Sequence, residues 1–352
     1  MKPPNEKQAV PLIIDLLADL IGRRANELRV RRAEAAGGPD FIITAPGRRF
    51  MAEYKVSAAA GALSATIDQL KRYAQAHADK SLLLIVVSFM GPLGRELCDK
   101  EGVSWLDLSG NAKIIAPGLT IRIEGRPNKF SDRGRPPNVF APKSSRIVRQ
   151  LLFDPQRLQT QAELARQTGL GDGYVSKSVG RLKQEHYLDA NSDGAVRPSD
   201  PNLLLDAWNA AYKFNRHRII AGHVPARSGD ELLDKLAKRF ARNRLDYAAT
   251  ALAAAWQFTK FAAFRLVTVY LQSMPPRTVL EELEFSDEPK GANLWLVLPD
   301  DEGVFQGSQR QDGVQCVSPV QTYLDLKEQP ERAKDAASEL RRRLLKWGQH
   351  ET

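Results

Sequence analysis

The first ninety residues carry hydrophobic patterns that switch between helical and strand-like spacing. Apolar positions from 9 to 21 recur with a helical period, which predicts an amphipathic helix. Three strand patterns follow, at residues 28–33, 40–44 and 49–56. A second helical pattern includes Ile67, Leu70 and Tyr73, and the continuous apolar run 81–89 is typical of a strand buried on both faces. The predicted order is therefore helix, three strands, helix, strand.

The middle of the chain predicts three short helices and a hairpin. The helical patterns cover residues 144–153, 161–167 and 173–185. Thr160 and Glu163 have the spacing of a capping box, which marks the start of the second helix. After the third helix, the Asp193-Gly194 turn separates two short strand patterns, 187–190 and 195–197.

The last third of the chain predicts an α+β arrangement. Strand patterns cover residues 216–221, 265–271, 278–285 and 293–298. Helical patterns cover residues 230–243 and 247–261, a short segment after Ser318, and a long segment from Pro330 to Trp347. Proline is favoured at the first position of a helix, so Pro330 is expected to begin the last one.

Between residues 91 and 123 the chain predicts a helix and three further strands. The helical pattern covers 91–99, and the strand patterns cover 103–108, 112–116 and 119–123. Gly110 and Asn111 favour a hairpin turn between the first two strands. The string Asp-Leu-Ser-Gly-Asn at 107–111 is also similar to proteins of mobile genetic elements that join a nuclease-like domain to a DNA-binding module.

Composition limits the class of protein. With 352 residues, 43% hydrophobic and 26% charged, the chain is long enough for two or three globular domains. The net charge of +9 favours association with polyanions. Residues 122–143 are rich in proline, glycine and basic side chains, which predicts a linker. This linker is expected either to lie along a phosphate backbone or to be a solvated hinge.

Several other classes have little support. Cys98 and Cys316 are far apart, and the five histidines form no metal-binding spacing, so a zinc site is not expected. No apolar run approaches the length of a membrane span, and the first residues lack a signal-peptide pattern. We therefore expect a cytoplasmic protein with no membrane partner.

The candidate chemistry lies in the second and third strand patterns. Asp40 begins one strand, and Glu53 and Lys55 are two residues apart in the next, where they share a face. Asp40 is close enough across the hairpin to reach them. Two carboxylates suit Mg²⁺, and a lysine suits a phosphate or an attacking water. The alternative is an exposed ion pair that contributes little.

With the order of elements, these residues resemble the αβββαβ core of the PD-(D/E)xK superfamily, which includes restriction endonucleases and Holliday-junction resolvases. Gln69 and Tyr73 are similar to a Gln-x-x-x-Tyr motif of some branches. The resemblance implies that Asp40 and Glu53 bind Mg²⁺ or Mn²⁺, that Lys55 serves the nucleophile or scissile phosphate, and that Gln69 supports the site. Such proteins often add an acid from the first helix. Glu6 is the candidate here, with Asp15 and Asp19 as competitors.

Residues 144–205 resemble a winged helix-turn-helix domain. The resemblance implies that the third helix enters the major groove of double-stranded DNA. The candidate DNA-binding residues on this helix and the hairpin are Tyr174, Ser176, Lys177, Ser178, Arg181, Lys183 and Arg197. Arg181 is the strongest candidate for a base or phosphate contact. The alternative is a protein–protein module whose polar face is only solvated.

Residues 317–326 and 332–337 look like the C-terminal part of abortive-infection type IV antitoxins, which join a winged helix to a nucleotidyltransferase-like domain. This chain lacks the Gly-Ser pair and following Asp-x-Asp or Asp-x-Glu of an active nucleotidyltransferase. We therefore expect a non-catalytic packing, dimerisation or partner-binding module.

The sequence predicts an α/β and α+β multidomain protein. Its expected parts are a nuclease-like domain (1–124), a basic linker (125–143), a winged helix-turn-helix (144–205) and a C-terminal α+β domain (206–352). The expected function is a DNA-binding protein with a Mg²⁺-dependent endonuclease domain. The alternatives are a non-cleaving regulator of the antitoxin kind and a scaffold for a partner protein of a mobile-element or defence system. A homodimer is plausible under the first two, because both strands of DNA are related by two-fold symmetry.

Overall fold

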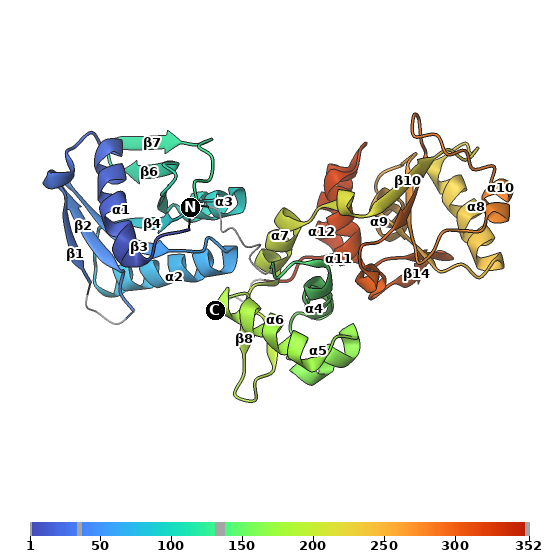
Figure 1. The fold of residues 1–352 in the computed structure, drawn as a ribbon, viewed down its shortest axis with the longest axis horizontal. Helices are drawn as coiled ribbons and strands as arrows, with labels where there is room; N and C mark the ends of the chain where they lie inside the picture. The colour runs from blue at the N-terminus through green and yellow to red at the C-terminus, as the bar shows by residue number, and fades with distance from the viewer. Residues whose placement is uncertain (1, 34–36, 131–137, 349–352) are drawn as a thin grey trace. The chain divides into compact units, whose positions relative to one another are not determined.

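The computed structural model describes residues 2–33, 37–130 and 138–348. It is a multidomain α/β protein with twelve α-helices and three β-sheets among these residues. The chain divides into two compact units, residues 1–137 with 183–187 and residues 138–182 with 188–352. Figure 1 labels the elements, and each unit is described by itself.

The first unit is built on a seven-stranded sheet in the order β1-β2-β3-β4-β5-β6-β7. Strands β3, β4 and β5 are parallel, and the pairs at either side of them are antiparallel. The strands are β1 (Arg29–Arg32), β2 (Phe41–Ala45), β3 (Arg48–Lys55), β4 (Leu82–Val87), β5 (Ser104–Asp107), β6 (Ala112–Ala116) and β7 (Leu119–Ile123). The helices are α1 (Glu6–Leu20), α2 (Ala60–Ala76) and α3 (Pro92–Glu101).

Each face of this sheet has its own hydrophobic core. Side chains alternate along β3, so Phe50, Ala52 and Tyr54 pack with α1, whereas Met51 packs with α2. The α1 helix begins at a capping box formed by Asn5 and Gln8. Helices α1 and α2 therefore cover opposite faces of the sheet (Figure 1).

The predicted linker is only partly within the described residues. Arg133 and Arg135 lie outside them, since residues 131–137 are not described. Two earlier residues of the segment bond to the turn after β5. The backbone N–H of Arg126 donates to Asn111 Oδ1 at 2.8 Å, and that of Lys129 donates to Ser109 Oγ at 3.1 Å. The segment as far as Lys129 is thus held against the first unit.

The second unit begins with three helices and a two-stranded hairpin, although Lys183 and Gln184 at the end of the third helix group with the first unit. These are α4 (Pro142–Phe153), α5 (Gln161–Thr168), α6 (Asp172–Gln184), β8 (Leu188–Ala190) and β9 (Val196–Pro198). The predicted capping box is present, with Thr160 accepting from the backbone of Glu163. Gly169 ends α5 in the left-handed conformation that favours glycine. Val175, Val179 and Leu182 form the buried face of α6, as their spacing predicted.

The rest of this unit is a six-stranded sheet, in the order β10-β13-β12-β11-β15-β14, with its helices. The strands are β10 (Arg218–Gly222), β11 (Tyr247–Thr250), β12 (Val267–Leu271), β13 (Leu294–Leu298), β14 (Gln309–Gln311) and β15 (Val314–Cys316). The helices are α7 (Pro201–Ala211), α8 (Gly229–Arg242), α9 (Ala251–Thr259), α10 (Arg277–Glu282), α11 (Pro319–Asp325) and α12 (Ala333–Leu344). Short 3₁₀ turns include η2 (Phe214–Arg216) and η3 (Glu302–Phe305).

Three sequence predictions were wrong here. The segment 247–261 is not one helix, because Tyr247–Thr250 forms β11 before α9 begins at Ala251. The segment 278–285 is not a strand, because Arg277–Glu282 forms α10. The final helix begins at Ala333, three residues after Pro330. The hairpin of β14 and β15 was not predicted at all.

No helix within residues 2–33, 37–130 and 138–348 is both long enough and apolar enough to span a bilayer.

Candidate functional site

Asp40, Glu53 and Lys55 are joined by hydrogen bonds at the carboxyl end of β3. The β2–β3 register places Asp40 opposite Glu53, because Phe41 pairs with Ala52. The backbone N–H of Asp40 donates to Glu53 Oε2 at 2.8 Å, and Lys55 Nζ donates to Glu53 Oε1 at 2.7 Å. The backbone N–H of Tyr54 in turn donates to Asp40 Oδ2 at 2.9 Å. The three residues that the sequence singled out are therefore connected, Lys55 and Glu53 through their side chains and Asp40 through its backbone N–H.

The surroundings of this cluster disfavour the ionised form of Asp40. Glu53 is 3% exposed, so its carboxylate lies under the surface beside a half-buried Asp40. Burial raises the pKa of the Asp40 carboxyl above its usual value, and the negative charges of Glu53 and Glu6 raise it further. The Tyr54 N–H and the Lys55 ammonium oppose this rise in pKa without cancelling it. Two carboxylates held together at partial burial lack full compensation by the protein.

Gln69 holds the segment that leads into Asp40. Its side chain, on α2, donates to the carbonyl oxygen of Gly38 at 3.1 Å and approaches that of Gly37 at 3.4 Å. It thus acts on the position of Asp40 through the backbone. Tyr73, one turn later, packs on the core under α2 and stacks on His77 with ring centroids 4.1 Å apart. The two residues of the Gln-x-x-x-Tyr pattern therefore differ in role, since only Gln69 supports the cluster.

Glu6 does not join the cluster through a hydrogen bond. It lies in the first turn of α1 and forms an ion pair with Arg32 of β1. Its charge still raises the pKa of Asp40, and both acids act on Arg32. Asp15 and Asp19 lie further along α1 and are exposed. Of the three candidate acids of this helix, Glu6 is the one whose charge acts on the site.

The donor set fits one Mg²⁺ or Mn²⁺ ion better than a closed metal cage. Among the described residues, no group of three or more His, Cys, Asp or Glu side chains could hold a metal. Mg²⁺ needs fewer protein ligands, because it keeps several waters and takes one or two carboxylates with phosphate oxygens of a substrate. Asp40 Oδ1 accepts no hydrogen bond from the described part of the chain, which leaves it available for such an ion.

A buried acid that the sequence placed in a strand, with no functional role, lies at the same sheet edge. Asp107 is opposite Val87, and Val87 is opposite Lys55, so all three end parallel strands at one level. Asp107 is 0% exposed and accepts from the backbone N–H groups of Met90 at 3.1 Å and Asn111 at 2.9 Å. It also accepts from the Asn111 side chain at 2.9 Å. Because both of its carboxylate oxygens accept hydrogen bonds, Asp107 holds the backbone at this edge and is not available as a metal ligand.

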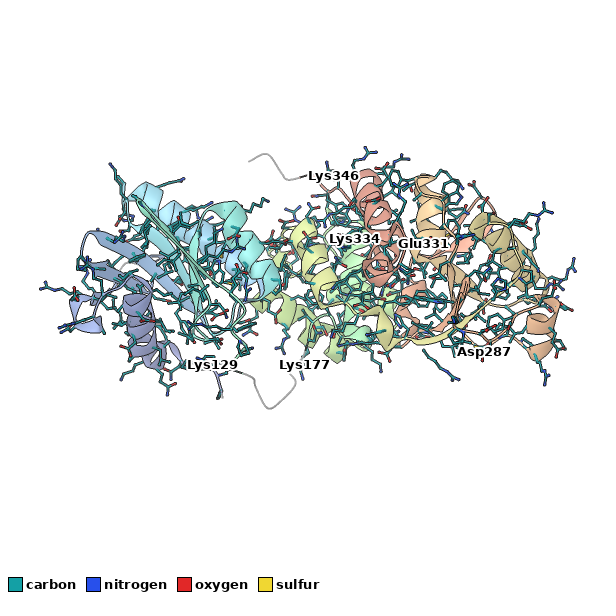
Figure 2. The ribbon with its side chains drawn as sticks, turned by 90° about the horizontal axis from the view of Figure 1, so that it is seen from above. Lys129, Lys177, Asp287, Glu331, Lys334 and Lys346 are labelled. Carbon is teal, nitrogen blue, oxygen red and sulfur yellow. The ribbon has the colours of Figure 1, made fainter. Side chains whose placement is uncertain are left out.

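In the second unit, the polar face of α6 and the hairpin is largely exposed. Ser176, Lys177 and Lys183 are exposed, and Figure 2 labels Lys177 at the surface. Ser178, Arg181 and Arg197 are half-buried. Tyr174 is 40% exposed, and its hydroxyl lies 2.9 Å from Ser144 Oγ, which fixes the ring. Lys177 is thus better exposed than Arg181, the residue that the sequence favoured.

Comparison with known proteins does not assign a family. No family model, no curated protein and no solved structure matches this chain. The roles of these residues therefore depend on the contacts and charges described above.

Proposed function

We propose that the first unit is a metal-dependent DNA endonuclease of the PD-(D/E)xK kind. The observation that carries this proposal is the hydrogen-bonded cluster of Asp40, Glu53 and Lys55 at the end of a central parallel strand. Two further features support it. The elements from α1 to β4 have the αβββαβ order, and Gln69 supports the segment before Asp40.

The residues divide the chemistry between them. Asp40 and Glu53 would hold one Mg²⁺ or Mn²⁺ ion, which when bound supplies Lewis acidity at the scissile phosphate and a more acidic water. The Lys55 ammonium places a positive charge beside the carboxylates, where it would bind a phosphate oxygen or orient the water. Its present bond to Glu53 Oε1 would be exchanged for one to the substrate. Gln69 keeps Asp40 in position through the backbone of Gly38.

We propose that α4, α5, α6 and the β8–β9 hairpin are a winged helix-turn-helix that docks on double-stranded DNA. An exposed polar face on α6, with Lys177 and Lys183, supports this proposal, as does the net charge of +9. Phosphate contacts would place the unit on the duplex, and contacts from α6 to base edges would give specificity. The remaining α+β part is then a non-catalytic module for packing, dimerisation or a partner protein.

A second candidate function is a non-cleaving transcriptional regulator of the antitoxin kind. One observation favours it. Both Glu53 oxygens already accept hydrogen bonds, and the described residues hold no three-ligand metal group. In that case the first unit would only grip DNA, with Glu53 and Lys55 as an internal ion pair.

Plasmid cleavage separates the two functions. Supercoiled plasmid is incubated with the full chain and Mg²⁺ or Mn²⁺, beside Lys55→Ala and the matched control Lys80→Ala, whose lysine is exposed in the same unit. An endonuclease nicks or linearises the plasmid, and Lys55→Ala lowers the rate by roughly 100-fold or more, as expected for a lost electrostatic contact to the transition state. DNA binding and the activity of Lys80→Ala should be unchanged. DNA binding by the wild type with no metal-dependent cutting would select the regulator.

A further inference from the structure

The second unit contains a small pocket with a positively charged floor and mouth. It has a volume of about 40 Å³ and lies between α4, α7, η2 and η3. The side chains used below that line it are Arg149, Trp208, Lys213, Arg216, Asp300 and Asp301. None of these residues belongs to the candidate nuclease cluster or to the polar face of α6, so the pocket has no role in the function proposed above.

Arg149 forms the floor and is a buried cation without an ion pair. It is 3% exposed, and burial lowers the pKa of its guanidinium to about 10. Its hydrogen-bond partners are neutral amides, with Nη2 donating to Gln321 at 2.6 Å and Nη1 to Gln306 at 3.4 Å. Its guanidinium lies over the Trp208 ring, 5.0 Å from the centroid. The Nε–H is buried and has no hydrogen-bond partner. A buried cation with an unused donor needs an anion nearby.

The carboxylate behind Arg149 does not meet this need by contact. Gln321 separates the two groups, because its oxygen accepts from Arg149 and its amide nitrogen donates to Asp325 Oδ1 at 2.8 Å. Asp325 is fully buried and also accepts from the hydroxyls of Thr250 and Tyr270. It accepts from the hydroxyl of Tyr212, a residue that lines the pocket, as well, but none of these bonds involves Arg149. The Gln321 amide connects Arg149 Nη2 to the Asp325 carboxylate, but the Arg149 Nε–H still has no hydrogen-bond partner.

The mouth of the pocket adds positive charge. Lys213 and Arg216 are exposed, and neither forms an ion pair within the described residues. Asp301 is neutralised by Arg146, which donates to both of its oxygens at 2.7 Å. Asp300 is exposed at the rim. With Arg149, Lys213 and Arg216 against Asp300, the excess charge is +2, counted as three positive charges less one.

We propose that this pocket binds a small oxyanion, such as phosphate or the phosphate head of a small ligand. A water needs roughly 10–15 Å³ of such space, so the pocket holds about three waters or one phosphate-sized group, and not a nucleoside. The Arg149 Nε–H would donate to one oxygen of the anion. Lys213 and Arg216 would cover the open side, and the Trp208 ring would keep the guanidinium in place. The bound anion would link α4 to the segment around η2.

Binding of inorganic phosphate to the full chain tests the proposal. Isothermal titration is done at constant ionic strength, with chloride replacing phosphate in the blank. The wild type should bind one phosphate per chain, and Lys213→Ala with Arg216→Ala should weaken binding by at least about tenfold, or 1.4 kcal/mol. The matched control is Arg227→Ala with Lys290→Ala, which removes two exposed cations from the same unit at positions that do not line the pocket.

Arg149→Lys tests the buried end of the pocket separately, because it keeps the positive charge and removes the guanidinium Nε–H donor. The variant should keep its circular dichroism spectrum and lose phosphate binding. If Arg149→Lys fails to fold, the mouth variants decide the question alone. The proposal is overturned if the wild type shows no saturable binding below about 10 mM phosphate. It is equally overturned if the control pair weakens binding as much as the mouth pair, since that result means diffuse charge attraction only.

Discussion

The backbone N–H of Asp40 donates to Glu53 Oε2 at 2.8 Å, so the residue just before β2 is held by the carboxylate it faces. This bond turns two acids that are thirteen positions apart into neighbours. It also brings two negative charges together in a partly buried place, where the single ammonium of Lys55 balances only one of them. The cluster is therefore expected to cost stability in the absence of metal.

The first prediction concerns the loss of stability caused by the two neighbouring carboxylates, Asp40 and Glu53. Asp40→Asn should raise the free energy of unfolding of the first unit at pH 7 by about 0.5–1 kcal/mol, because it removes one of two neighbouring carboxylate charges. The Asn side-chain oxygen can still accept from the Tyr54 N–H, and the bond from residue 40 to Glu53 uses only the backbone. Thermal melting in EDTA measures the effect. Mg²⁺ should stabilise the wild type and not the variant, because only a ligand that binds the native state raises its stability.

The stability difference between Asp40→Asn and the wild type depends on pH, and its sign follows from the raised pKa of Asp40. The folded chain binds this proton more tightly than the unfolded chain, so wild-type stability falls as the pH rises through the folded pKa. The advantage of Asp40→Asn should thus be full at neutral pH and vanish below the unfolded pKa of an aspartate. Asp68→Asn, on the exposed side of α2, is the matched control and should show neither effect. A destabilised Asp40→Asn would contradict the charge argument.

A second prediction concerns Asp107, at the same sheet edge, and tests whether its buried hydrogen bonds stabilise the fold. Asp107→Ala leaves the N–H groups of Met90 and Asn111 and the Asn111 amide without their buried acceptor. Each unsatisfied buried donor costs about 1–3 kcal/mol, so a loss of about 3 kcal/mol or more is expected in urea unfolding. Asp15→Ala, at an exposed position of α1, should change stability by less than about 0.5 kcal/mol. Equal effects of the two substitutions would show that the network around Asp107 contributes nothing.

The sequence predicted the first unit well because its periodicities are local and unambiguous. Strands such as Leu82–Val87 are continuous apolar runs, and each helix has a single apolar face. Asp40, Glu53 and Lys55 could be grouped because a two-residue spacing and one hairpin determine their geometry. The ion pair of Glu6 with Arg32 could not be predicted, since Glu6 lies in α1 and its partner lies in β1, 26 positions away. The buried bonds of Asp107 were not predicted, because a strand pattern does not show which donors reach a side chain.

The second unit shows where local signals fail. Ala248 and Ala249 favour helix, but β11 lies between β12 and β15, and pairing with strands distant along the chain determines its structure. The segment after Pro276 has strand-like residues, yet it forms α10 with an ion pair between Arg277 and Glu281, one turn apart. The pocket around Arg149 left no signal in the sequence. Its lining comes from segments as far apart as residues 140 and 304, which only the fold brings together.

The third prediction concerns DNA binding by α6. Lys177 is exposed and forms no ion pair within the described residues, so it is available for phosphate. Lys177→Ala should weaken binding to specific and random duplexes alike. It should also reduce the slope of log K against log salt by about 1, the effect of one lost phosphate contact. The measurement is fluorescence anisotropy over a salt series, with Lys290→Ala as the exposed control. An unchanged slope would remove Lys177 from the interface, and a loss confined to one sequence would make it a base contact.

The last prediction concerns His217, whose ring lies between a backbone donor and a tyrosine. The N–H of Asp300 donates to Nδ1 at 3.1 Å, so the proton of the neutral ring is on Nε2, which lies 3.0 Å from the Tyr212 hydroxyl. Burial lowers the pKa of His217 to about 4. The unfolded chain therefore binds a proton that the folded chain lacks between about pH 4 and 6.5, and stability rises with pH across this window. The full rise from this residue is up to roughly 3 kcal/mol, since each pKa unit corresponds to 1.36 kcal/mol.

Asp325 acts in the opposite direction over nearly the same range. Burial raises its pKa to about 6, so the folded chain holds its proton more tightly and stability falls as the pH rises from about 4 to 6. In the wild type the two effects largely cancel. His217→Gln removes one of them, because the glutamine amide can replace a ring nitrogen without titrating. The stability of the variant relative to the wild type should then fall as the pH rises across this window. Urea unfolding at pH 4, 5 and 6 measures both slopes, and parallel slopes would mean that His217 is not held neutral in the folded chain.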